Sequence, residues 1–149
     1  MRKIWKICAV ALSAAVLTVL AGCSARTAIT ADEFQKQAKS AGYTVTAPEN
    51  DDSAAMKSFV ATKSGSDVQI DYHLFANAYS AQNWYNTQKN SMKTGTTKTV
   101  VDSDNYSKFT VSNGEIRYVL VRMDKTALLC KAVSSKSGDV DSFLKTIKY

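Results

Sequence analysis

An aspartate and a histidine two residues apart on one predicted strand are the first residues whose types could do chemistry. Asp71 and His73 occur in the run "VQIDYHLF", and alternate residues of a strand point to the same face of its sheet. A carboxylate beside an imidazole can orient the ring as a general base, or the two groups can bind a metal. The same pair also fits the ordinary polar face of a half-exposed strand.

The rest of the sequence adds no recognisable catalytic set. His73 is the only histidine, and no Gly-x-Ser-x-Gly, His-Glu-x-x-His or glycine-rich phosphate loop occurs. We therefore predict no metal site and no cofactor, and we leave catalytic activity open. Trp84 and Tyr85 could stack on a sugar, but they share a helical stripe with Ala81 and Met92, which equally fits core packing.

The N-terminus has the features of a secretory leader. The chain begins with "MRKIWK", which contains the cations Arg2, Lys3 and Lys6, and continues with the uncharged run "ICAVALSAAVLTVLA". This run is shorter than the roughly 18 to 20 apolar residues that span a bilayer. A basic start, a short apolar run and small residues at its end are typical of a signal peptide.

The end of that run, Leu20-Ala21-Gly22-Cys23, resembles the lipobox of bacterial lipoproteins. The resemblance implies that the Cys23 thiol carries a diacylglyceryl group as a thioether, and that cleavage before Cys23 makes it the first mature residue. Two acyl chains hold a protein stably on a membrane. We therefore expect a lipid-anchored protein of the cell membrane that faces the extracellular or periplasmic side. The alternative is an unlipidated secretory peptide in which the cysteine occurs by chance.

This assignment divides the chain into three parts. Residues 1–22 are predicted to be the lipoprotein signal peptide, residues 23–29 a short tether, and residues 30–149 a single α+β domain. The tether beyond Cys23 extends to about 20 Å at most, so we expect the domain to lie near the lipid headgroups.

The charge of the mature chain is smaller than that of the whole sequence. The sequence has 19 Lys and Arg against 13 Asp and Glu, but three of the cations belong to the leader. About +3 remains, and we predict no nucleic-acid binding from it.

The three cysteines reduce to one free thiol. Cys8 leaves with the signal peptide and Cys23 is expected to be alkylated, which leaves Cys130 in the apolar run "ALLCKAV". A single thiol cannot form an internal disulfide, so the domain must be stabilised by packing alone. We expect Cys130 to be a small buried core residue.

Three segments have helical signals. In "TADEFQKQAKSAG", Thr30 and Glu33 form a capping-box pattern and Gly42 provides the exit. "SAQNWYNTQKNSMK" is predicted to begin with Ser80 as its cap, and "SKSGDVDSFLKTIKY" ends the chain with a third helix.

The strands are predicted from apolar alternation and turn residues. "YTVTAP", "KSFVAT" and "VQIDYHLF" precede the second helix, and a brief "TVVD" strand followed by "YSKFTVS", "EIRYVLVRM" and "ALLCKAV" comes after it. Asn113-Gly114 is the dipeptide of type I′ hairpins.

The resulting order is α-βββ-α-(β)βββ-α. It predicts an α+β fold with an antiparallel sheet of about six to seven strands and with the helices packed on one face. The hairpin runs "KSFVATKSGSDVQIDY" and "SKFTVSNGEIRY" share a strand-turn-strand rhythm, which would fit a weak internal duplication. Two hairpins can also look alike without common descent.

The segments "TADEFQKQAKSAGYTVT", "YSAQNWYN" and "FLKTIKY" are similar to those of small lipoproteins of Gram-positive gut bacteria. None of these segments is a catalytic motif. The resemblance therefore implies only a fold and a location at the cell membrane.

We expect a non-catalytic module on the outer side of the membrane that binds an envelope protein, peptide or glycan through the sheet face around Gln69, Asp71 and His73. Membrane lipid is the second expected partner, through Cys23. The alternative is an envelope hydrolase that uses His73 and Asp71.

Overall fold

The computed structural model describes residues 26–51, 54–92 and 95–149. The lipobox residues Leu20, Ala21, Gly22 and Cys23 lie outside these ranges. The helices are α1 (Ala31–Ser40), α2 (Ala78–Ser91) and α3 (Ser137–Thr146), with a short 3-10 turn, η1 (Ser134–Lys136), before α3. The strands are β1 (Thr44–Thr46), β2 (Lys57–Lys63), β3 (Val68–Leu74), β4 (Thr96–Asp102), β5 (Tyr106–Asn113), β6 (Ile116–Met123) and β7 (Thr126–Val133).

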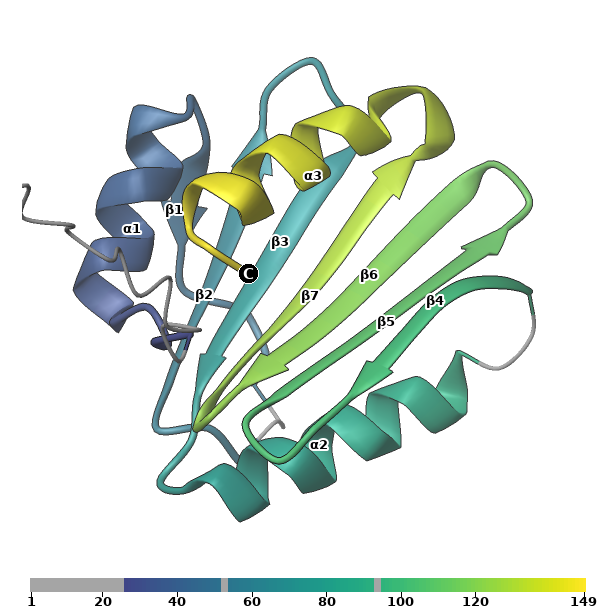
Figure 1. The fold of residues 1–149 in the computed structure, drawn as a ribbon. Helices are drawn as coiled ribbons and strands as arrows, with labels where there is room; N and C mark the ends of the chain where they lie inside the picture. The colour runs from purple at the N-terminus through teal and green to yellow at the C-terminus, as the bar shows by residue number, and fades with distance from the viewer. Residues whose placement is uncertain (1–25, 52–53, 93–94) are drawn as a thin grey trace, which may run out of the picture.

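The strands form a single antiparallel sheet in the order β1-β2-β3-β7-β6-β5-β4 (Figure 1). Two meanders, β1-β2-β3 and β4-β5-β6-β7, are joined at the centre, where β3 pairs with β7. The α+β class, the antiparallel sheet and the predicted order of elements are confirmed. None of the helices in the described ranges is long and apolar enough to cross a membrane.

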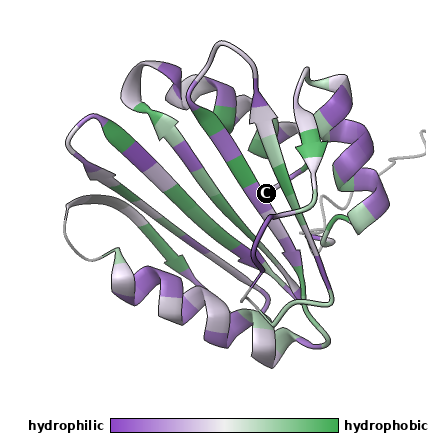
Figure 2. Cartoon of the chain, turned by 180° about the vertical axis from the view of Figure 1, so that it is seen from behind, coloured by the Kyte–Doolittle hydropathy of each residue, from purple (hydrophilic) through white to green (hydrophobic). Residues whose placement is uncertain are grey.

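The helices cover both faces of the sheet, whereas we expected them on one. Helices α1 and α3 share a face and pack over Ile70, Tyr72 and Leu128 (Figure 1). Helix α2 packs on the opposite face, where Tyr85 meets Leu120, as the view from behind shows (Figure 2). The physical reason is that β6 and β7 bury apolar residues on both faces: Val119, Val121, Leu128 and Cys130 pack with α1 and α3, and Leu120 packs with α2. A strand that is covered on both faces has a continuous apolar run rather than an alternating one.

Local signals explain where the helices begin. The Thr30 side chain accepts a hydrogen bond from the Glu33 amide at 3.2 Å, as the capping pattern predicts. For α2 the predicted cap was wrong: Asn77 caps the helix by accepting from the Ser80 amide at 2.8 Å. Asparagine and serine both cap helices well, and the burial of Phe75 before the cap places the start three residues earlier.

The tight turn between β5 and β6 also differs in detail from the expected one. Asn113 pairs with Ile116, so Gly114 and Glu115 are the two central residues. Only Gly114 has a positive φ, of 61°. A glycine at the first central position is typical of a type II′ turn rather than the predicted type I′ turn.

The two hairpins compared in the sequence are β2–β3 and β5–β6, and they lie on either side of β7 in the sheet. An internal duplication stays a prediction.

Candidate functional site

The Asp71 and His73 side chains lie on the same face of β3, as predicted, but they make different contacts. The Nδ1 atom of His73 lies 2.9 Å from the Ser58 hydroxyl on the neighbouring strand β2. The imidazole also packs on the Trp84 ring, with 4.6 Å between the ring centroids. Asp71 accepts a hydrogen bond from the Gln69 side-chain amide at 2.8 Å.

Burial raises the pKa of the Asp71 carboxyl, while the Gln69 hydrogen bond and nearby Lys131 lower it. A serine hydroxyl beside a histidine is the type of contact that a hydrolase uses. However, neither of the two cavities described below is lined by Ser58, Asp71 or His73. The described residues contain no group of three or more His, Cys, Asp and Glu side chains that could hold a metal ion.

The aromatic pair on α2 is part of the core. Tyr85 is fully buried against Phe109 and Leu120, and Trp84 is partly buried between two small clusters. Cys130 is also fully buried on β7, as predicted. Burial raises the pKa of its thiol, so the thiol is protonated and shielded at neutral pH.

A second region, on the α1/α3 face, is built around the segment that enters the domain. Ile29 is buried, and both of its backbone polar groups are bonded: its amide donates to the Tyr149 hydroxyl at 3.1 Å, and its carbonyl accepts from the Tyr72 hydroxyl at 3.1 Å. The Thr126 hydroxyl donates to the Met123 carbonyl at 2.7 Å. Tyr149 therefore donates to Thr126 in the contact between their hydroxyl oxygens. The result is a buried relay that ties the first described residues to the last.

The folded part of the chain thus begins before the expected start at residue 30. The Arg26 guanidinium carbon lies 4.2 Å from the centroid of the Tyr106 ring on β5, a cation–π contact. Arg26 is three residues after Cys23, a distance of about 11 Å at full extension. Little chain therefore separates the expected acylation site from the body of the domain.

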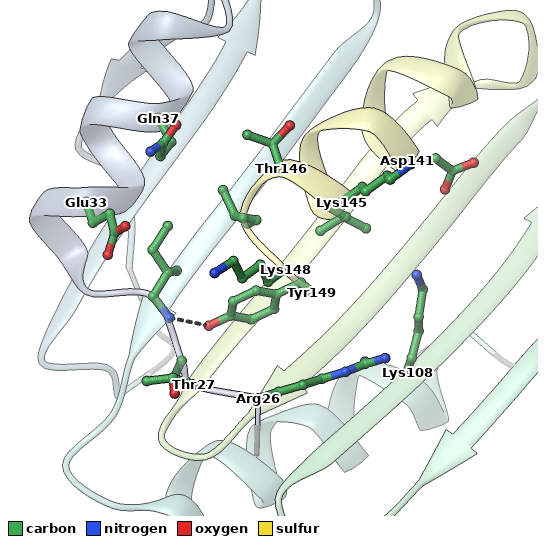
Figure 3. A pocket seen from close by; sticks show the side chains of 14 residues that line it. Arg26, Thr27, Glu33, Gln37, Lys108, Asp141, Lys145, Thr146, Lys148 and Tyr149 are labelled. Carbon is green, nitrogen blue, oxygen red and sulfur yellow. Dashed lines mark hydrogen bonds between the residues drawn. The ribbon is translucent and has the colours of Figure 1, made fainter. Parts of the chain in front are cut away.

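A cavity of about 780 Å³ opens beside this segment (Figure 3). It lies between α1, the C-terminal end of α3 and the Lys108 side chain of β5. Its charged lining residues are four cations and two carboxylates: Arg26, Lys108, Lys145, Lys148, Glu33 and Asp141. We call this cavity the basic groove. A smaller cavity of about 300 Å³ lies on the other side of Thr27–Ile29.

The charges of the basic groove are not balanced by ion pairs. Asp141 is engaged by Arg117, at 2.9 Å and 3.0 Å between the two pairs of atoms. Within the described ranges, none of the four cations that line the groove forms an ion pair. The lining side chains therefore carry an excess of positive charge, four cations against two carboxylates, that is open to an anionic ligand.

Sequence reasoning missed this groove. Lys108 and Lys148 come from a central part of the chain and from its end, and only the antiparallel register brings β5 near the end of α3. The one available signal was that Lys145 and Lys148 both occur in the last five residues of the sequence.

No protein-family model and no curated protein sequence matches the chain. Among solved structures, the chain is similar to the crystal structure of a GTP-binding regulator from Thermotoga maritima. The TM-score is 0.55 with 14% sequence identity, over 80% of this chain and 84% of that chain. At this identity the likeness shows the fold alone.

Proposed function

We propose that the protein is a lipid-anchored module of the cell envelope, held on the outer side of the membrane by acylated Cys23, where it binds an envelope protein, peptide or glycan. The leader and the Leu20–Cys23 motif support the anchor. One structural observation supports the proposal most: Arg26 and Ile29, only a few residues after Cys23, are in contact with the domain. An anchor at Cys23 would therefore hold the domain against the lipid headgroups, because no long flexible tether separates the two.

The sheet face opposite α1 and α3 is the surface proposed for the partner. Helix α2 covers β6 and β7 on this side and leaves the β1–β3 end without a helix (Figure 2). Gln69 and Asp71 are partly exposed there, next to exposed Thr62 and Lys131. A mixed row of amide, carboxylate, hydroxyl and ammonium groups suits a polar partner.

Metabolic labelling with a fatty-acid analogue tests the anchor. We expect Cys23→Ala to abolish incorporation of the label and to leave unprocessed precursor, because no other thiol occupies the position that is acylated. Cys130→Ala is the matched control: it also removes one cysteine, but a buried one, and the label should persist. Continued labelling of Cys23→Ala would refute the assignment.

A further inference from the structure

The basic groove gathers its cations from three separate parts of the fold. Arg26 belongs to the entering segment, Lys108 to β5, and Lys145 and Lys148 to the end of α3. Figure 3 shows the Arg26 side chain extending toward Lys108, with Lys148 beside Tyr149 between the two helices. Arg26 and Lys108 thus lie on one side of Tyr149, whereas the Lys148 side chain points toward α1. An excess of positive charge along one groove favours an anionic ligand.

The opposite wall of the groove has a different chemistry. Glu33 and Gln37 project from α1 across from the cations. A carboxylate and an amide oxygen accept hydrogen bonds, which suits hydroxyl groups. The complete lining therefore matches a ligand with a negative charge at one end and hydroxyl groups at the other.

The position of the groove limits where such a ligand comes from. Arg26 lines the groove and lies within about 11 Å of Cys23 along the chain. If Cys23 is acylated, the groove is held at the depth of the lipid headgroups. A phospholipid with a glycerol headgroup presents a phosphodiester and hydroxyl groups at that depth.

We propose that the basic groove binds the headgroup of an anionic phospholipid, with the phosphodiester at Arg26 and Lys108 and the headgroup hydroxyls at Glu33 and Lys148. This inference rests on the proposed anchor, because the anchor supplies the nearness to the membrane. It gives the tethered domain a fixed orientation, with the α1/α3 face toward the lipid and the sheet face around Gln69 and Asp71 toward the partner.

Lysine footprinting of the mature acylated protein tests the proposal. The protein is reconstituted in phosphatidylcholine vesicles with or without phosphatidylglycerol and treated briefly with a water-soluble acetylating reagent. We expect Lys108, Lys145 and Lys148 to react roughly fivefold more slowly in the anionic vesicles, the factor typical of one cation near an anionic surface. Lys131, on the opposite face, should react at the same rate in both.

Two matched variants test the groove itself. Lys145→Gln/Lys148→Gln should abolish the protection of Lys108, whereas Lys131→Gln/Lys136→Gln removes the same charge elsewhere and should preserve it. Equal rates in both vesicles, or equal protection of Lys131, would overturn the proposal. Inorganic phosphate added to phosphatidylcholine vesicles must not reproduce the protection, because that result would assign the groove to a soluble phosphate.

The acylation of Cys23 and the binding of lipid in the basic groove can be tested independently. The mass of the same preparation reports whether Cys23 is acylated. If it is not, the groove can still be assayed by adding phosphatidylglycerol vesicles to the full chain.

Discussion

At the scale of single residues, Lys148 occupies a position that normally belongs to glycine. Its φ is 64°, and it follows the last turn of α3. The Tyr149 amide bonds to the Leu144 carbonyl at 2.8 Å, and the Lys148 amide bonds to the Lys145 carbonyl at 3.2 Å. These are the two hydrogen bonds of a Schellman motif, in which glycine is the usual left-handed residue. Because lysine has a side chain, this position carries backbone strain that a glycine would not.

Lys148→Gly should therefore stabilise the protein. The left-handed conformation costs a residue with a side chain about 1–2 kcal/mol, whereas a cation at a helix C-terminus contributes only about 0.3–1 kcal/mol. We expect the free energy of unfolding to rise by about 0.5–1 kcal/mol in urea denaturation. Lys148→Ala keeps the strain and loses the charge, so it should give no gain. A gain in Lys148→Ala, or a loss in Lys148→Gly, would contradict this explanation.

At the scale of elements, the entering segment and the end of α3 stabilise each other. The Tyr149 hydroxyl accepts from the Ile29 amide and donates to Thr126, and all three residues are buried. A buried amide without an acceptor costs about 1–3 kcal/mol. The segment nearest the expected anchor therefore depends on the last residue of the chain.

Tyr149→Phe should destabilise the protein by about 1–3 kcal/mol, because it leaves the Ile29 amide unpaired. Thermal or urea unfolding measures the loss. Tyr79→Phe is the control, since Tyr79 is 75% exposed and its hydroxyl should contribute little. Equal stability of Tyr149→Phe and the wild type would show that the relay is not a stabilising contact.

Tyr149 should also affect how the free energy of unfolding depends on pH in the alkaline range. Burial raises the pKa of Tyr149 from 10.0 to about 12, so folding favours its neutral form. This contribution is complete below pH 10 and is lost as the pH rises through about 12. The stability of Tyr149→Phe should consequently fall less steeply than that of the wild type between pH 10 and pH 12.

The sequence predicted which segments form helices and strands better than it predicted which face of the sheet each helix covers. Thr30, Glu33 and Gly42 are local signals, and they place α1 correctly because capping depends on neighbours in the chain. The side of the sheet that α2 covers depends on which strand residues stay buried at long range. The groove depends on the same register, which brings Lys108 near residues some forty positions later. Local patterns contain no information about such pairs.

At the scale of the whole molecule, the two faces of the sheet have different proposed roles. The face with α1 and α3 carries the entering chain and the basic groove, and the face with α2 carries the partly exposed polar strands. A domain that is fixed at Arg26 and oriented by lipid would present the second face away from the membrane. The lipid on Cys23 is the condition on which this orientation depends.

The intact mass of the protein purified from the membranes of the cells that make it tests this account most directly. We predict a chain that begins at Cys23 and carries a diacylglyceryl group on the Cys23 sulfur. A free thiol at this position, or an N-terminus formed by cleavage elsewhere, would contradict the account.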